Sequence, residues 1–151
     1  MLGRIMRSAD FELALSSPAK ARSAHFAAHH VPVAPLRAQW RRCKAPTDEL
    51  STDHPVPCTQ AVDDADRQAP DACWFGAVVP KRHARRAATR NLLKRQIRAA
   101  MLRHEPRLAR GLWLVRVRAP FERARYHAAT SPALCAAARD ELEQLLGRAG
   151  D

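Results

Sequence analysis

One segment, from Lys81 to Arg98, constrains the fold of this chain more than any other, because it combines a helical pattern with a dense run of cations. It reads KRHARRAATRNLLKRQIR. At about 100° per residue, the apolar side chains of this segment and of the residues just after it share one stripe: Leu93, Ile97, Ala100 and Met101. The pattern predicts a helix over about 85–103 that packs through this stripe. The helix must end before Pro106, because proline disfavours helical geometry in the residue that precedes it.

The other side of this predicted helix is cationic. The segment holds eight lysines and arginines and no acid, and four polar residues fall in an arc of roughly 100°: Asn91, Lys94, Arg95 and Arg98. Helices that only face solvent usually mix charge signs, because opposite charges at i, i+4 are stabilising and like charges repel. The absence of acids therefore favours a polyanionic partner over a merely solubilising face. Six of the eight cations are arginines, whose forked guanidinium suits phosphate oxygens.

The composition agrees with a polyanionic partner. The 151 residues carry a formal net charge of +11 and a pI near 10.9, and the length allows one domain, residues 1–151. The longest apolar runs are only a few residues, too short for a membrane-spanning segment. Asp10 and Glu12 fall where a secretory signal would have its continuous apolar region. We therefore expect a cytoplasmic protein with no membrane partner.

No metal site is predicted. The four cysteines, Cys43, Cys58, Cys73 and Cys135, are far apart and form no CxxC motif, so reduced thiols are expected. Two clusters resemble metal ligands, the first being His25, His29 and His30 with Cys43, and the second Asp63, Asp64 and Asp66. Both are expected to be ordinary polar side chains, since the first spans a strand and a proline-rich loop and the second lies in a segment with no regular pattern.

The other periodic segments predict helix, strand, strand, strand and helix, in chain order: 9–15, 25–33, 73–79, 112–118 and 132–147. Ser8 and Ser131 are the expected N-caps of the two helices, and Gly147 the expected end of the second. The strands at 25–33 and 73–79 are expected to pair antiparallel.

Residues 35–71 differ from the rest of the chain. They are rich in proline and carry seven acids with no sustained period of 2 or 3.6. Such a segment cannot bury enough apolar surface to offset its ordering entropy, so we expect a disordered insertion between two strands. A functional contact through Trp40, Arg41 and Arg42 is the alternative.

The cationic helix also carries a family signature. Ala87, the pair Arg90–Asn91, the pair Lys94–Arg95 and Arg98 resemble the RNR motif of the bacterial ribonuclease P protein component. The resemblance extends to RSADFELAL, FGAVVPKR, GLWLVRVRAP and LCAAARDELEQLLGR, and so to most of the chain outside 35–71. Three positions depart from the family pattern: Leu15, Pro80 and Ala84.

The resemblance implies an α+β fold. This fold is a small two-layer sandwich in the order helix, strands, helix, strand, helix, similar to that of some ribosomal proteins. It has a four-stranded mixed sheet with a left-handed βαβ crossover. The resemblance also implies the protein subunit of ribonuclease P. In that enzyme a large RNA hydrolyses precursor tRNA with Mg²⁺ and releases the 5′ leader, so Mg²⁺ would act through the RNA subunit and no catalytic residue is expected here.

Carried onto this sequence, the family motif assigns contacts with the catalytic RNA to Arg82, Arg85, Arg86, Arg90, Asn91, Lys94, Arg95 and Arg98. It assigns a cleft for the leader of precursor tRNA to Phe11, Phe26 and Arg118. Charge alone would also allow a structural RNA-binding protein of ribosomal type or a DNA-compacting protein. The sequence leaves the oligomeric state open.

Overall fold

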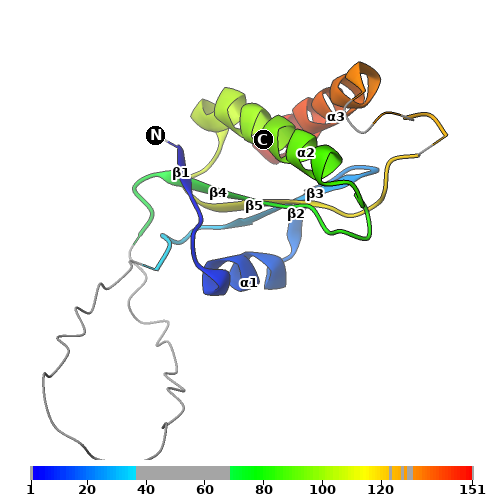
Figure 1. Ribbon diagram of the computed structural model, residues 1–151. Coiled ribbons are helices and arrows are strands. Elements are labelled where there is room, and N and C mark those ends of the chain that lie inside the picture. Colours follow the sequence, from blue (N-terminus) through cyan, green and yellow to red (C-terminus); the bar gives the residue numbers. More distant parts are fainter. Residues whose placement is uncertain (1, 37–68, 123, 127, 129–130, 151) are drawn as a thin grey trace, which may run out of the picture.

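The computed structural model describes residues 2–36, 69–122, 124–126, 128 and 131–150. A mixed β-sheet lies at its centre, with α2 and α3 on one face and the shorter α1 on the other (Figure 1). The helices are α1 Ser8–Ser16, α2 Ala87–His104 and α3 Pro132–Gly150, and a 3-10 turn, Glu105–Arg107, follows α2. The strands are β1 Leu2–Arg4, β2 Ala19–Arg22, β3 Phe26–Val31, β4 Cys73–Val78 and β5 Gly111–Val117. The predicted α+β class is confirmed, with five strands instead of four.

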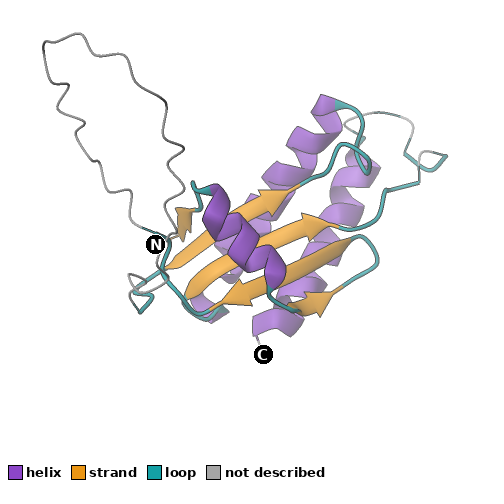
Figure 2. Ribbon diagram, turned by 90° about the horizontal axis from the view of Figure 1, so that it is seen from below, coloured by secondary structure: helices purple, strands orange, loops and turns teal. Residues whose placement is uncertain are grey.

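The strand order is β1-β4-β5-β3-β2 (Figure 2). β4 runs parallel to β1 and β5, whereas β3 is antiparallel to β5 and β2. The predicted antiparallel pairing of 25–33 with 73–79 is therefore wrong, because β5 lies between them. Six of the seven residues of β5 are buried, as expected of a central strand covered on both faces.

The main core lies between the sheet and the α2–α3 layer. From β3 and β5, alternate residues face this layer: Phe26, Ala28, Trp113, Val115 and Val117. The predicted stripe of α2 is at most 1% exposed, and Leu134, Ala138, Leu142 and Leu145 of α3 are at most 2% exposed. Burial of one such large apolar side chain contributes about 1.5–3 kcal/mol. Both predicted packing faces are confirmed.

The helix ends follow local chemistry. α2 ends at His104, before Pro106, as predicted, but it begins at Ala87. Ser131 is the predicted N-cap of α3, since its Oγ accepts a hydrogen bond from the Leu134 amide at 3.0 Å. Ser8, by contrast, is not a cap: it is the first helical residue of α1, and Arg7 precedes it.

α3 also continues past Gly147, its predicted end, to Gly150. Leu146 and Ala149 are fully buried and keep this last turn against the core. Packing of these two side chains therefore overrides the weak helix propensity of glycine.

Most of the predicted insertion lies outside the described residues. Among the candidate groups within it, the structure describes neither the Trp40–Arg41–Arg42 contact, nor the acids at 63, 64 and 66, nor the cysteines at 43 and 58.

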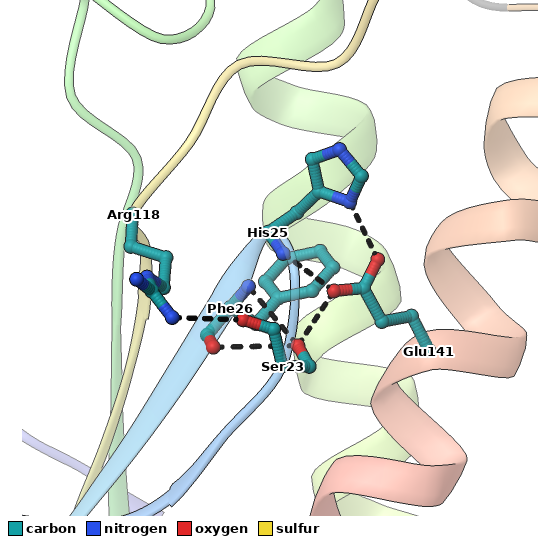
Figure 3. Close-up of polar contacts among 5 residues, drawn as sticks. All are labelled: Ser23, His25, Phe26, Arg118 and Glu141. Carbon is teal, nitrogen blue, oxygen red and sulfur yellow. Dashed lines mark hydrogen bonds and ion pairs between the residues drawn. The ribbon is translucent and has the colours of Figure 1, made fainter.

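A polar cluster ties the turn between β2 and β3 to α3 (Figure 3). Glu141 Oε1 accepts hydrogen bonds from the Ser23 hydroxyl and the His25 amide, both at 2.6 Å, and Glu141 Oε2 lies 2.8 Å from His25 Nδ1. Burial alone would raise the pKa of the Glu141 carboxyl, but the hydrogen bonds from Ser23 and His25 outweigh it and hold this pKa below its usual range. The cluster thus favours the carboxylate.

Glu141→Gln should lower the free energy of unfolding by about 1–3 kcal/mol at pH 7, because it weakens two hydrogen bonds to a charged acceptor. Since the pKa is lower in the folded state, the stabilisation is present above the unfolded pKa, about 4.3, and is lost as the pH falls through the folded value. Urea unfolding between pH 5 and pH 3 should therefore show the difference between the two proteins shrinking. A difference that stays constant over this range would contradict the assignment.

Candidate RNA interface

The outer side of α2 carries an exposed row of polar side chains that we call the cationic strip: Asn91, Lys94, Arg95 and Arg98. Within the described part of the chain, no carboxylate forms an ion pair with the three cations of the strip. The Arg98 guanidinium lies 5.9 Å from the centre of the Phe75 ring, within the range of a cation–π contact. The predicted unneutralised face is therefore present.

The C-terminal end of α2 differs from the strip. Arg103 and His104 both contact Glu143 of α3, as an ion pair and as a hydrogen bond respectively. Burial would raise the pKa of Glu143, but its contacts with His104 and Arg103 lower it overall. Glu143 of α3 thus compensates charge at the end of α2, whereas no carboxylate of the described residues pairs with the strip.

Arg90 is not part of the exposed row. Its Nη1 donates hydrogen bonds to the carbonyl oxygens of Ala84 at 3.0 Å and Arg85 at 2.7 Å, and the side chain is half-buried. The guanidinium therefore joins the first turn of α2 to the connection that follows β4. The prediction that Arg90 contacts RNA is not tested by this geometry, but the residue has a structural role that the sequence did not indicate.

Arg90→Ala should lower the free energy of unfolding by about 1–2 kcal/mol, because one partly buried and one exposed carbonyl lose their donor. Arg95→Ala, a matched change on the exposed row, should alter stability by less than about 0.5 kcal/mol. The melting temperatures of the two variants, measured by thermal unfolding, test this difference. Equal melting temperatures would show that the Arg90 contacts contribute nothing.

Three further predicted contacts, Arg82, Arg85 and Arg86, are exposed and lie in the connection between β4 and α2. Of these, Arg82 donates a hydrogen bond from its Nε to His83 Nε2 at 3.1 Å. Burial lowers the pKa of His83, and the positive charges of Arg82 and Arg116 lower it further. The electropositive surface thus continues from the strip around the N-terminus of α2.

The predicted leader cleft is only partly assembled. Phe26 is fully buried on the α2–α3 side of the sheet, so its assignment to an open cleft is wrong. The cause is register: Phe26 pairs with Val117, and both point into the main core. Arg118 is exposed but donates to the Ser23 carbonyl at 3.1 Å, which holds it at the turn between β2 and β3.

Phe11 lies on the opposite face, against the sheet. A Cβ added to Gly76 would come within 2.6 Å of the Phe11 ring and 2.9 Å of Leu114, so the glycine makes room for this ring. A hollow of about 250 Å³ beside the β1 edge brings Phe11 together with the cations of the strip; its lining includes Arg4, Phe11, Ala77, Lys94, Arg95 and Arg98. β1 pairs with β4 only as far as Phe75, which leaves the hollow open.

A further candidate lies on the α1 face of the sheet, outside the lining of this hollow, and was not predicted from the sequence. Arg116 is half-buried on the α1 side of β5, between Ala27 and Val78, and its buried Nε has no hydrogen-bond partner among the residues that the structure describes. The alternation in GLWLVRVR contains the signal, because Leu112, Leu114 and Arg116 must share one face. A buried donor without a protein partner suits an anionic ligand.

The described residues contain no group of three histidines, cysteines or acids that could hold a metal ion. In the same part of the chain, no helix is long and apolar enough to cross a membrane. Cys73 and Cys135 are free thiols, the former buried.

A mixed sheet covered by helices, with an arginine-rich helix left unneutralised on its surface, defines the class: a small α+β protein suited to binding a polyanion. The model of the Ribonuclease P family matches residues 3–150, and the chain therefore belongs to the family of bacterial ribonuclease P protein components. The structure is similar to that of Staphylococcus aureus RNase P protein, with a TM-score of 0.55 and 17% sequence identity over 95% of this chain and 92% of that one. No curated protein matches the sequence.

Proposed function

We propose that this chain binds the catalytic RNA of ribonuclease P and the 5′ leader of precursor tRNA, and so assists the endonucleolytic removal of the leader. The observation that carries the proposal is the cationic strip. Three exposed cations on one rigid helix, with no acid from the described chain to neutralise them, are complementary to the phosphates of a structured RNA. In this proposal the RNA performs the hydrolysis with its own Mg²⁺, and the protein contributes binding and orientation.

The leader is proposed to run past Phe11 through the hollow beside the β1 edge. Phe11 offers a half-buried ring on which one base can stack, and such stacking contributes about 1–3 kcal/mol per base. Lys94, Arg95 and Arg98 line the same hollow and can hold the neighbouring phosphates. Arg116, whose Nε has no hydrogen-bond partner in the described part of the chain, replaces Phe26 in this assignment.

Reconstitution with a bacterial ribonuclease P RNA tests the proposal. At low Mg²⁺ the chain should increase cleavage of precursor tRNA, and Phe11→Leu should reduce the gain for a substrate with a leader more than it affects binding to the catalytic RNA. A folded protein that leaves cleavage unchanged would refute the proposed function. Preference for ribosomal RNA over the catalytic RNA would instead favour the structural alternative.

A further inference from the structure

A second, larger hollow, with a volume of about 910 Å³, lies at the carboxyl ends of the parallel strands β4 and β5. Its walls are the connection from β4 to α2, the described residues 120–122, 126 and 128 after β5, and the first turn of α3. These segments lie together at one end of the sheet (Figure 1). In α/β units, this end is where ligands commonly bind, because loops diverge there and a helix begins. We call it the terminal pocket.

The walls of the terminal pocket differ in chemistry. Arg82, Arg85 and Arg86 line one side, and the rings of Phe121 and Tyr126 line the other. Leu93 and Leu134, at most 2% exposed, form an apolar floor. Among the described lining residues, the three arginines face a single acid, Glu122. An anion with a flat apolar part fits this combination better than a simple anion would.

The aromatic wall is held in place by the protein. Phe121 stacks on His25 with ring centres 4.0 Å apart and an angle of 11° between the planes, and it meets Tyr126 edge-on at 5.9 Å. His25 is in turn fixed by Glu141 of α3 (Figure 3). A ring that is ordered before binding loses little entropy when a ligand stacks near it.

The start of α2 adds positive potential to the pocket. Thr89 of its first turn lines the pocket, and the first turn contains no acid. The partial positive charge of a helix N-terminus therefore adds to that of the arginines. Charge, volume and aromatic surface come from three different segments and converge on one place.

We propose that the terminal pocket binds one unpaired ribonucleotide, with its base against Tyr126 and Phe121 and its phosphate against the arginines at the start of α2. The inference rests on the proposed function and deepens it, because it adds a nucleotide site on the α2–α3 side of the sheet, separate from the hollow at Phe11. Single-stranded RNA is recognised through unstacked bases on aromatic rings, whereas a duplex offers no free base. The pocket therefore selects for an unpaired position in the RNA.

The test compares Tyr126→Leu with Tyr126→Phe in the full chain, each confirmed to be folded by its thermal transition. The probes are a single-stranded RNA pentamer carrying 2-aminopurine and an RNA duplex of equal charge. Tyr126→Leu should weaken pentamer binding about 5- to 150-fold, and duplex binding should not change. Tyr126→Phe, which keeps the ring, should bind like the unchanged protein. The salt dependence should be the same in all three, since no phosphate contact is removed.

Affinity for the catalytic RNA alone and affinity of the assembled complex for precursor tRNA then identify the source of the nucleotide. If Tyr126→Leu weakens binding to the catalytic RNA alone, the nucleotide belongs to the catalytic RNA. If it weakens only the binding of precursor tRNA to the assembled complex, the nucleotide belongs to the precursor. Either result supports the pocket. Equal losses for pentamer and duplex, or no loss at all, would overturn it. If only the pocket proposal is wrong, the unchanged chain still increases cleavage of precursor tRNA. If the proposed function is wrong, the chain does not increase this cleavage.

Discussion

Ile97→Asp is expected to abolish the cooperative thermal unfolding transition of this protein. Ile97 of α2 is fully buried against the sheet, and the described residues of that core include no cation that could pair with a carboxylate. Burial of an unpaired charge, together with the loss of a large apolar side chain, costs more than about 4 kcal/mol. Domains of this size have a total stability of about 5–15 kcal/mol, so most of the folded population should be lost. Circular dichroism during heating measures the effect.

Arg98→Asp is the matched control, because it places the same side chain one residue further along the same helix, on the exposed strip. This variant should keep a sharp transition near that of the unchanged protein. If Arg98→Asp unfolds as well, the effect belongs to helix propensity or charge and not to burial. A normal transition in Ile97→Asp would show that the packing face of α2 is misassigned.

Replacement of Lys94, Arg95 and Arg98 together by alanine is expected to weaken binding to ribonuclease P RNA by about 100-fold near physiological salt. Each cation that neutralises one phosphate contributes about 0.7–0.9 to the slope of log K against log salt. The triple variant should therefore reduce this slope by about 2–3 while it keeps its thermal transition. Filter binding or fluorescence anisotropy at several salt concentrations provides both quantities.

The control for this prediction removes equal charge elsewhere. Lys20, Arg139 and Arg148 are exposed and lie on β2 and α3, away from the strip, and their joint replacement by alanine also removes three positive charges. It should change affinity and slope far less than the strip variant. Equal losses in the two variants would mean that net charge, and not a defined surface, drives binding.

The parts of the fold that depend on one segment could be predicted from the sequence. The apolar stripe of α2 and the buried face of α3 follow from helical periodicity, and Pro106 and Ser131 mark helix ends by local chemistry. Strand pairing could not be predicted from the sequence, because it depends on contacts between distant segments. An antiparallel pairing was expected for 25–33 and 73–79, but β5 lies between these two strands. It can do so because α2 carries the chain back to the start of the sheet, so that β5 runs parallel to β4. β1 and β2, with three and four residues, are too short for a pattern.

The same limit explains the outcome for the site. A helical wheel correctly places Lys94, Arg95 and Arg98 outside, since that needs only the direction of each side chain. It cannot show that Arg90 reaches back to two carbonyls before the helix begins. The side of the sheet to which Phe26 points depends on register with Val117, and for this reason an aromatic expected in a cleft lies in the core.

Photo-crosslinking from the cationic strip is the most direct test of the account. A benzoylphenylalanine replaces Asn91, which is exposed beside the cations of the strip, and in a second protein it replaces Arg148, exposed near the C-terminal end of α3. With ribonuclease P RNA, position 91 should give a strong crosslink at one or a few nucleotides, and position 148 should give little. Strong crosslinks from position 148, with none from position 91, would contradict the claim that the exposed side of α2 is the RNA-binding surface.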